Sequence, residues 1–144
     1  MQLSNHPSRP LEVKLEIPVR TYDIDFAGIV SNIVYIRWLE DLRIKLLEEH
    51  FPPIHQKEQA IFPVLSETQI VYKRPVRLFD HVVGQLWISN LKRLKWSVQA
   101  EILCNNELAA VATQTGAFVD FKSIRPVPIP DELSQKFLAY QHVL

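Results

Sequence analysis

Asp25 stands where a carboxylate of this sequence is best placed to do chemistry. The segment around it, residues 22–43, reads YDIDFAGIVSNIVYIRWLEDLR, in which a tight turn leads into an apolar helix. The carboxylate therefore lies just ahead of a helix N-terminus, where the first backbone N–H groups have no intrahelical partner. Those groups stabilise a nearby ionised carboxylate and can hold an oxygen on which charge develops. The arrangement suits attack on a polarised carbonyl, although an ordinary turn or capping aspartate is the more frequent use of such spacing.

A second carboxylate, Asp23, precedes Asp25 by two residues. If the strand before them continues to Asp25, both side chains point to one face, and a paired-carboxylate mechanism is geometrically possible. If the chain instead turns at Ile24, the two side chains diverge. We favour the second alternative, in which Asp23 positions the loop or contacts solvent.

The elements that must hold this segment can be predicted from hydrophobic periodicity. Apolar residues alternate through residues 11–20, which indicates a half-buried strand. Ser31 or Asn32 can cap a helix that runs to about Glu49, and the first half of this helix is apolar on nearly all sides. A loop at residues 51–62 precedes four further strands, at residues 64–72, 82–89, 95–104 and 107–121.

Turn residues in the second half of the chain support consecutive antiparallel strands. Asn105-Asn106 favours a tight hairpin, and Gly116 inside the last strand predicts a bulge. The long apolar helix must bury its surface against the sheet, because no other large partner is present. The sequence therefore predicts the α+β class, with a curved antiparallel sheet of about five strands wrapped round one long central helix. Trp87 and Trp96 are left for the outer face of the sheet, where a second copy can pack.

The 144 residues are enough for one domain with a substantial core. We expect residues 1–10 to form a flexible N-terminal tail and residues 11–130 to form the main domain. A C-terminal helix, within residues 131–144, is expected to pack on that same domain.

Composition excludes several classes of function. Sixteen Lys and Arg balance sixteen Asp and Glu, so the chain has no basic field for nucleic acid or for a membrane surface. No apolar run approaches the roughly 20 residues of a membrane span. Cys104 is the only cysteine, which excludes an intrachain disulfide and fits a cytoplasmic location. The five histidines are scattered, and their spacing predicts no metal site.

A spaced pattern accompanies the DFAGIV turn, and it consists of Tyr22, Asp23, Asp25, Gly28, Val30, Asn32, Tyr35, Trp38, Glu40 and Arg43. With KRPVRLFD at residues 73–80 and RPVPIP from residue 125, this pattern resembles the 4-hydroxybenzoyl-CoA thioesterase family of hotdog-fold acyl-CoA thioesterases. The resemblance covers roughly residues 11–130. Asn32 stands where several members carry Tyr or His, which leaves the acyl substrate open.

The resemblance implies a hotdog fold and an acyl-CoA thioesterase, which hydrolyses an acyl-CoA or acyl carrier protein thioester to a carboxylic acid and a thiol. It makes Asp25 the catalytic carboxylate, either as the nucleophile or as the general base on water. The backbone N–H of Asn32 then polarises the thioester carbonyl, and its side chain is expected to cap the helix. The implied substrate-binding residues are Gly28, Val30, Ser31, Asn32, Tyr35, Lys92 and Arg93, the last two as partners of the CoA phosphates.

No cofactor is implied, and sites in the family lie between two subunits, so we expect a homodimer or homotetramer. Glu40 matches a helix carboxylate used in a related hotdog subfamily, but it lies roughly 12 Å along the helix from Asn32. We expect it to pair with Arg43 instead. Two alternatives stay open: a hotdog protein that binds acyl thioesters without hydrolysing them, and a hotdog dehydratase. A dehydratase is expected to carry a histidine in the motif, and residues 22–43 contain none.

Overall fold

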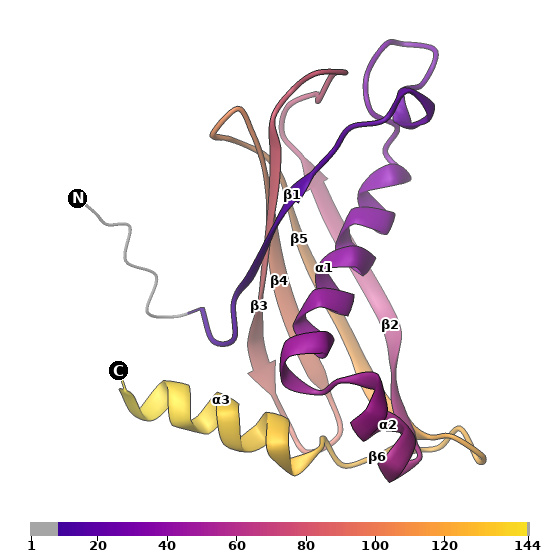
Figure 1. The fold of residues 1–144 in the computed structure, drawn as a ribbon, viewed down its shortest axis with the longest axis vertical. Helices are drawn as coiled ribbons and strands as arrows, with labels where there is room; N and C mark the ends of the chain where they lie inside the picture. Colours follow the sequence, from indigo (N-terminus) through magenta and orange to yellow (C-terminus); the bar gives the residue numbers. More distant parts are fainter. Residues whose placement is uncertain (1–8, 144) are drawn as a thin grey trace.

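The structure is a computed structural model that describes residues 9–143 (Figure 1). Within that range the strands are β1 (Val13–Ile17), β2 (Ile61–Tyr72), β3 (Val82–Leu91), β4 (Trp96–Cys104), β5 (Glu107–Asp120) and β6 (Pro126–Val127). The helices are α1 (Val34–His50), α2 (Pro53–Gln59) and α3 (Asp131–Val143), and a 3-10 turn at Thr21–Asp23 follows β1.

The strands form one sheet in the order β1-β3-β4-β5-β2, with every neighbouring pair antiparallel and β6 paired to β5. The sheet curves round α1, which lies along its concave face (Figure 1) and packs mainly against β1 and β3. The predicted class, a curved antiparallel sheet round one long helix, is confirmed. Because α1 lies on the β1 side, the concave face near the other edge strand, β2, receives less cover from this helix.

Helix α1 buries one face and exposes a second apolar stripe. The residues that it buries are Val34, Tyr35, Trp38, Leu39, Leu42 and Leu46. Ile33, Ile36 and Ile44 point to solvent, and Ile36 keeps 40% of its surface exposed. The prediction that the first half of this helix is buried on nearly all sides is therefore wrong for one copy of the chain.

Two local features differ from the sequence prediction for physical reasons. The loop predicted at residues 51–62 contains α2, because Pro53 sits in the first turn, where its missing N–H is not needed. The bulge expected at Gly116 lies on the neighbouring strand, where Ser66 is the extra residue opposite Gly116 and Thr115. The hairpin at residues 105–106 is confirmed, with positive φ angles of 50° and 68°.

Trp96 and Trp87 lie on opposite faces of the sheet, so the prediction that both face outward is wrong for Trp96. The Trp96 ring belongs to the core, and its indole N–H donates to the carbonyl of Ala117 at 3.0 Å. Gly116 lets this ring approach the backbone, since a Cβ there would lie 2.3 Å from it and 2.0 Å from the Val64 carbonyl oxygen.

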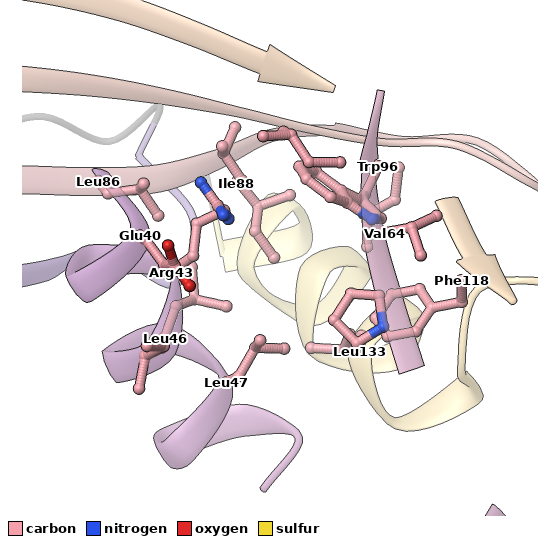
Figure 2. Close-up of a pocket in the computed structure, with 15 residues that line it drawn as sticks. Glu40, Arg43, Leu46, Leu47, Val64, Leu86, Ile88, Trp96, Phe118 and Leu133 are labelled. Carbon is pink, nitrogen blue, oxygen red and sulfur yellow. The ribbon is translucent and has the colours of Figure 1, made fainter. Parts of the chain in front are cut away.

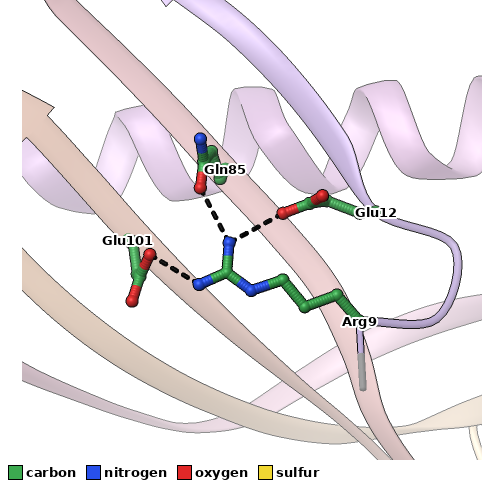
Figure 3. A network of polar contacts seen from close by, with 4 residues as sticks. All are labelled: Arg9, Glu12, Gln85 and Glu101. Carbon is green, nitrogen blue, oxygen red and sulfur yellow. Dashed lines mark hydrogen bonds and ion pairs between the residues drawn. The ribbon is translucent and has the colours of Figure 1, made fainter. Parts of the chain in front are cut away.

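Arg9 fastens the start of the described chain to the outer face of the sheet (Figure 3). Its Nη1 donates to Glu12 at 2.9 Å and to Gln85 at 2.8 Å, and its Nη2 donates to Glu101 at 2.7 Å. The guanidinium also stacks over Trp87, with 4.0 Å between its central carbon and the ring centroid. Arg9 and Pro10, which the sequence placed in a flexible tail, are therefore held, and the remaining tail, residues 1–8, lies outside the described residues.

Helix α3 packs over one end of the sheet and joins the main core through Leu133 and Phe137. Two contacts tie it to α2: His55 Nδ1 lies 2.9 Å from a Glu132 carboxylate oxygen, and the Gln59 amide donates to the other at 3.2 Å. Among residues 9–143, no helix is both long enough and apolar enough to cross a membrane.

Candidate functional site

Asp25 closes a five-residue loop between the 3-10 turn and α1. Its N–H donates to the Ile29 carbonyl at 2.8 Å, and its side-chain Oδ1 accepts the N–H groups of Ala27 at 2.9 Å and Ile29 at 3.5 Å. Gly28 completes the loop with a φ of +81°, which side chains disfavour. Within residues 9–143 the second carboxylate oxygen, Oδ2, has no partner. The loop thus orients the half-exposed carboxylate through one oxygen and leaves the other available.

Asp23 has a different surrounding from Asp25, because β1 ends at Ile17 and the chain turns before reaching either residue. The buried Asp23 side chain accepts the N–H of Arg20 at 2.8 Å, and its carbonyl accepts the N–H of Ser31 at 2.9 Å. Asp23 therefore joins the two ends of the loop to each other. This geometry fits the loop-positioning role and gives no support to a paired-carboxylate mechanism.

All four backbone N–H groups from Gly28 to Ser31 are already used, that of Ile29 by the Asp25 side chain. The acceptors are Asp25 O for Gly28 at 3.0 Å, Val76 O for Val30 at 2.8 Å and Asp23 O for Ser31 at 2.9 Å. Among the residues that the structure describes, the N–H groups of Asn32 and Ile33 have no acceptor. Ile33 is the N-cap of α1 and Asn32 immediately precedes it, so both N–H groups lie near the positive end of the helix dipole. Of the backbone donors implied by the resemblance, the N–H of Asn32 is therefore the one free to bind a substrate oxygen.

The start of α1 also corrects the prediction for the Asn32 side chain. The helix begins one residue later than expected, with Ile33 at the N-cap and no side-chain capping bond. In the described part of the chain the exposed Asn32 amide makes no hydrogen bond, so it does not cap the helix. The Asn32 carbonyl accepts the Tyr72 hydroxyl at 2.9 Å, which ties the helix start to the end of β2.

Tyr35, expected to contact substrate, lies in the core beneath this helix start. Its ring contacts Trp38 and Tyr72, with centroid distances of 4.9 and 5.0 Å. Burial raises the pKa of Tyr35 to about 12, so the phenol stays protonated near neutral pH. In one copy of the chain Tyr35 therefore supports the loop through packing, and Val30 is buried beside the same core.

A cavity of about 220 Å³ opens between the C-terminal half of α1, the concave face of the sheet and α3 (Figure 2). Glu40 and Arg43 lie at one end, and Leu133 and Phe118 lie at the other. Apart from these two charged residues, its lining is apolar. Sequence reasoning missed this cavity, because finding it requires knowing which strand residues face the helix.

The two charged residues at the cavity do not form the ion pair that the sequence predicted. Arg43 reaches across to the sheet instead, and its Nη1 donates to Gln114 Oε1 at 2.6 Å. The buried Gln114 amide in turn donates to Thr68 Oγ1 at 2.9 Å. Burial lowers the pKa of Arg43, while the charge of Glu40 opposes that shift. A glutamine at an inward-facing position of the strand sequence AAVATQTGAF was the sequence signal for this buried network.

Lys92 and Arg93 lie on the turn between β3 and β4, as predicted, but at the end of the sheet away from Asp25. The start of β3, Val82, pairs with Ile17 at the Asp25 end. Nine residues of strand, or roughly 30 Å at 3.3 Å per residue, separate Val82 from Leu91. One copy of the chain therefore does not bring these cations near Asp25.

The side chains that can bind metal ions are dispersed over this fold. Within the described range, residues 9–143, no three His, Cys, Asp or Glu side chains are grouped closely enough to hold one. The buried Cys104 thiol donates to Asp80 at 3.3 Å, and burial raises its pKa to about 11. This thiol is therefore a poor nucleophile near neutral pH.

Comparison with known proteins shows which family this chain resembles. A family model described as the thioesterase-like superfamily matches residues 19–137. Of the curated proteins, YneP of Bacillus subtilis (strain 168), named as a candidate acyl-CoA thioesterase, is 27% identical over 131 residues, which cover 89% of this chain and 94% of its own. The chloroplastic acyl-acyl carrier protein thioesterase ATL3 of Arabidopsis thaliana is 27% identical over 132 residues, which cover 88% of this chain and 68% of its own.

A solved structure gives the corresponding likeness in three dimensions. A thioesterase from Thermus thermophilus, complexed with coenzyme A and Zn, superposes with a TM-score of 0.77 at 23% identity. The match covers 92% of this chain and 96% of the other. Together with the family match, this likeness confirms the hotdog fold that the sequence resemblance implied.

Proposed function

Because the chain belongs to the thioesterase-like superfamily, we propose that it is a hydrolase of acyl thioesters. In this reaction an acyl thioester and water give a carboxylic acid and a free thiol. The observation that carries the proposal is that the loop leading into α1 holds both an oriented carboxylate with a free oxygen and a backbone donor without an acceptor in the described chain. These are Asp25 Oδ2 and the N–H of Asn32.

The proposed mechanism uses both groups on the thioester carbonyl. The N–H of Asn32 binds the carbonyl oxygen and stabilises the negative charge that develops there. Asp25 either attacks the carbonyl carbon, giving an acyl-aspartyl anhydride that water then opens, or removes a proton from the attacking water. In both routes the carbon–sulfur bond breaks, and the thiolate leaves and takes up a proton.

The thiol carrier is proposed from the relatives. YneP is named for acyl-CoA and ATL3 for acyl carrier protein, and the Thermus thermophilus structure contains coenzyme A. We therefore propose acyl-CoA as the substrate, with acyl carrier protein thioesters as the second candidate. Thiol release from matched acyl-CoA and acyl carrier protein thioesters, followed with a thiol reagent, tests both. Binding without thiol release would support the non-catalytic alternative and contradict the proposal.

The active unit is proposed to be a homodimer formed along β2. This twelve-residue edge strand has no neighbour on one side within the described chain, and such an edge is a template for pairing. The exposed isoleucines of α1 and the exposed Leu65 of β2 lie where a second copy would cover them. Two-fold antiparallel pairing of β2 would put opposite ends of the two sheets side by side. Asp25 of one copy would then face the cavity and the Lys92–Arg93 turn of the other.

We predict that the protein is a dimer or larger in solution and that Ile36→Glu weakens its association. Light scattering should give at least twice the monomer mass for the unchanged protein, and a lower mass with parallel loss of thioesterase activity for the variant. The matched control is Ile54→Glu, because Ile54 is also exposed but lies on α2. A fully active monomer at assay concentration would contradict the prediction. Assembly into a tetramer and a cytoplasmic location remain predictions.

Lys92 and Arg93 are predicted to bind the CoA phosphates rather than to take part in the chemistry. The double change to Ala should raise KM for an acyl-CoA with little change in kcat, as expected when uniform binding is lost. The difference should shrink at high salt, since exposed charges are screened within about 10 Å at 0.1 M ionic strength. Steady-state kinetics on an acyl-CoA and on a short acyl thioester without the nucleotide provide the measurement.

The short thioester is the internal control for this prediction, since it has no phosphates and should not respond to the double change. The matched protein control is Lys14→Ala with Lys57→Ala, which removes two exposed cations from other elements. Equal losses on both substrates would show that the turn supports the fold and that the phosphate site lies elsewhere.

A further inference from the structure

Helix α3 supplies one side chain, Leu133, to the cavity between α1 and the sheet. Leu133 is 2% exposed, and it lies at the opposite end of the cavity from Glu40 and Arg43 (Figure 2). Trp96 and Phe118, both buried, belong to the same apolar end. The cavity thus has a polar end and an apolar end, and the C-terminal helix contributes to the apolar one.

The mouth of the cavity lies between α1 and β2. The exposed lining residues are Glu40, Ile44 and Leu65, whereas Leu86, Trp96 and Leu133 are buried. A ligand that enters beside Glu40 therefore meets polar groups first and apolar groups last. A ligand fits such a cavity best when its polar part lies at the mouth and its apolar part lies inside. The cavity therefore suits an acyl group with its thioester at the mouth and an apolar terminus inside.

The apolar end is held in place from several sides, so its position is defined. Leu133 follows Ile129, whose N–H donates to the Arg93 carbonyl at 2.9 Å. Glu132, its neighbour in sequence, is held by His55 and Gln59 of α2. A wall fixed in this way limits the length of what can lie in front of it, because a buried core does not yield without loss of stability.

We propose that Leu133 determines the acyl-chain length that the enzyme accepts, by closing the inner end of the acyl pocket. The substrate class is an acyl thioester whose terminus is apolar. A terminal carboxylate would be desolvated among Trp96, Phe118 and Leu133 without a partner. This inference rests on the proposed thioesterase function and adds to it the residue that sets substrate length.

The test is a chain-length profile of kcat/KM, measured with saturated acyl-CoA substrates from four to sixteen carbons on the full-length protein. Leu133→Ala enlarges the inner end, so chains one or more methylenes beyond the wild-type optimum should gain roughly tenfold in kcat/KM, the selectivity usual for a methylene in an apolar pocket. Leu133→Phe should shift the optimum to shorter chains. The matched control is Leu138→Ala on the same helix, because Leu138 is 52% exposed and does not line the cavity.

The possible outcomes separate this inference from the proposed function. Opposite shifts in the two Leu133 variants, with an unchanged profile for Leu138→Ala, would support it. If the wild-type enzyme is active and all variants keep its profile, Leu133 does not set the length. If Leu133→Ala melts below the assay temperature, the Leu133→Phe shift decides alone. If the wild-type protein releases thiol from no acyl-CoA and no acyl carrier protein thioester, the proposed function fails, and this inference fails with it.

Discussion

Asp25→Asn is expected to lower kcat on an acyl thioester by at least roughly a hundredfold while the fold is kept, because removing a general base or nucleophile usually has that effect. The loop should survive the change. The amide oxygen of an asparagine can still accept the N–H groups of Ala27 and Ile29 that now bind Asp25 Oδ1. What is lost is the charge on Oδ2. Thiol release under saturating substrate, together with a melting curve, provides the measurement.

The control for this change is Asp41→Asn, which removes a carboxylate from an exposed position of α1 and should leave kcat unaltered. Turnover of the Asp25 variant within a factor of about ten of wild type would exclude Asp25 as the catalytic carboxylate. A single turnover in ¹⁸O-labelled water then tests the nucleophilic route. If Asp25 attacks and water opens the anhydride at the aspartyl carbonyl, the first product carries unlabelled aspartyl oxygen, whereas general-base catalysis puts labelled oxygen into the first product.

Among variants in which one glycine is replaced by alanine, Gly116→Ala is expected to lose the most stability. The added Cβ would lie 2.0 Å from the Val64 carbonyl oxygen and 2.3 Å from the Trp96 ring, so backbone and an indole would both have to move. Overpacking typically destabilises by about 1–3 kcal/mol, and we expect the upper end here, because a backbone carbonyl and an indole ring both obstruct the new Cβ. For a chain of this length that corresponds to a fall in Tm on the order of 10 °C.

The other two glycines serve as controls, because their surroundings differ in a known way. At Gly84 the added Cβ would meet the ends of the Ile17 and Leu42 side chains at 2.9 Å, and those ends can rotate. At Gly28 it would meet nothing within 4 Å, and the positive φ alone would be unfavourable. Thermal unfolding of all three variants tests the ranking. Equal Tm values for the Gly116 and Gly84 variants would contradict it.

The features that could be predicted from the sequence are those that depend on a local pattern of residues. The fold class followed from one long apolar helix and consecutive alternating strands. The loop around Asp25 followed from Gly28 and from the change of hydrophobic period at the start of α1. The part of the candidate site formed by the loop around Asp25 could therefore be identified from the sequence alone.

Features that depend on strand register could not be predicted in this way. Arg43 pairs with Gln114 rather than with Glu40, because the strand that faces the helix at this point happens to present an amide. Trp96 faces inward because the register places it opposite Gly116. The cavity is lined from four strands and two helices, so no single segment carries a signal for it.

Arg9 gives a practical boundary for anyone who shortens this chain. The family match begins at residue 19, so a version trimmed to the shared region would lose both Arg9 and strand β1 while keeping Glu101, a partner of Arg9. The Trp87 ring, now covered by the guanidinium, would become an apolar patch on the outer face of the sheet. Such a shortened protein would be more prone to non-native association, although its proposed catalytic residues would all be present.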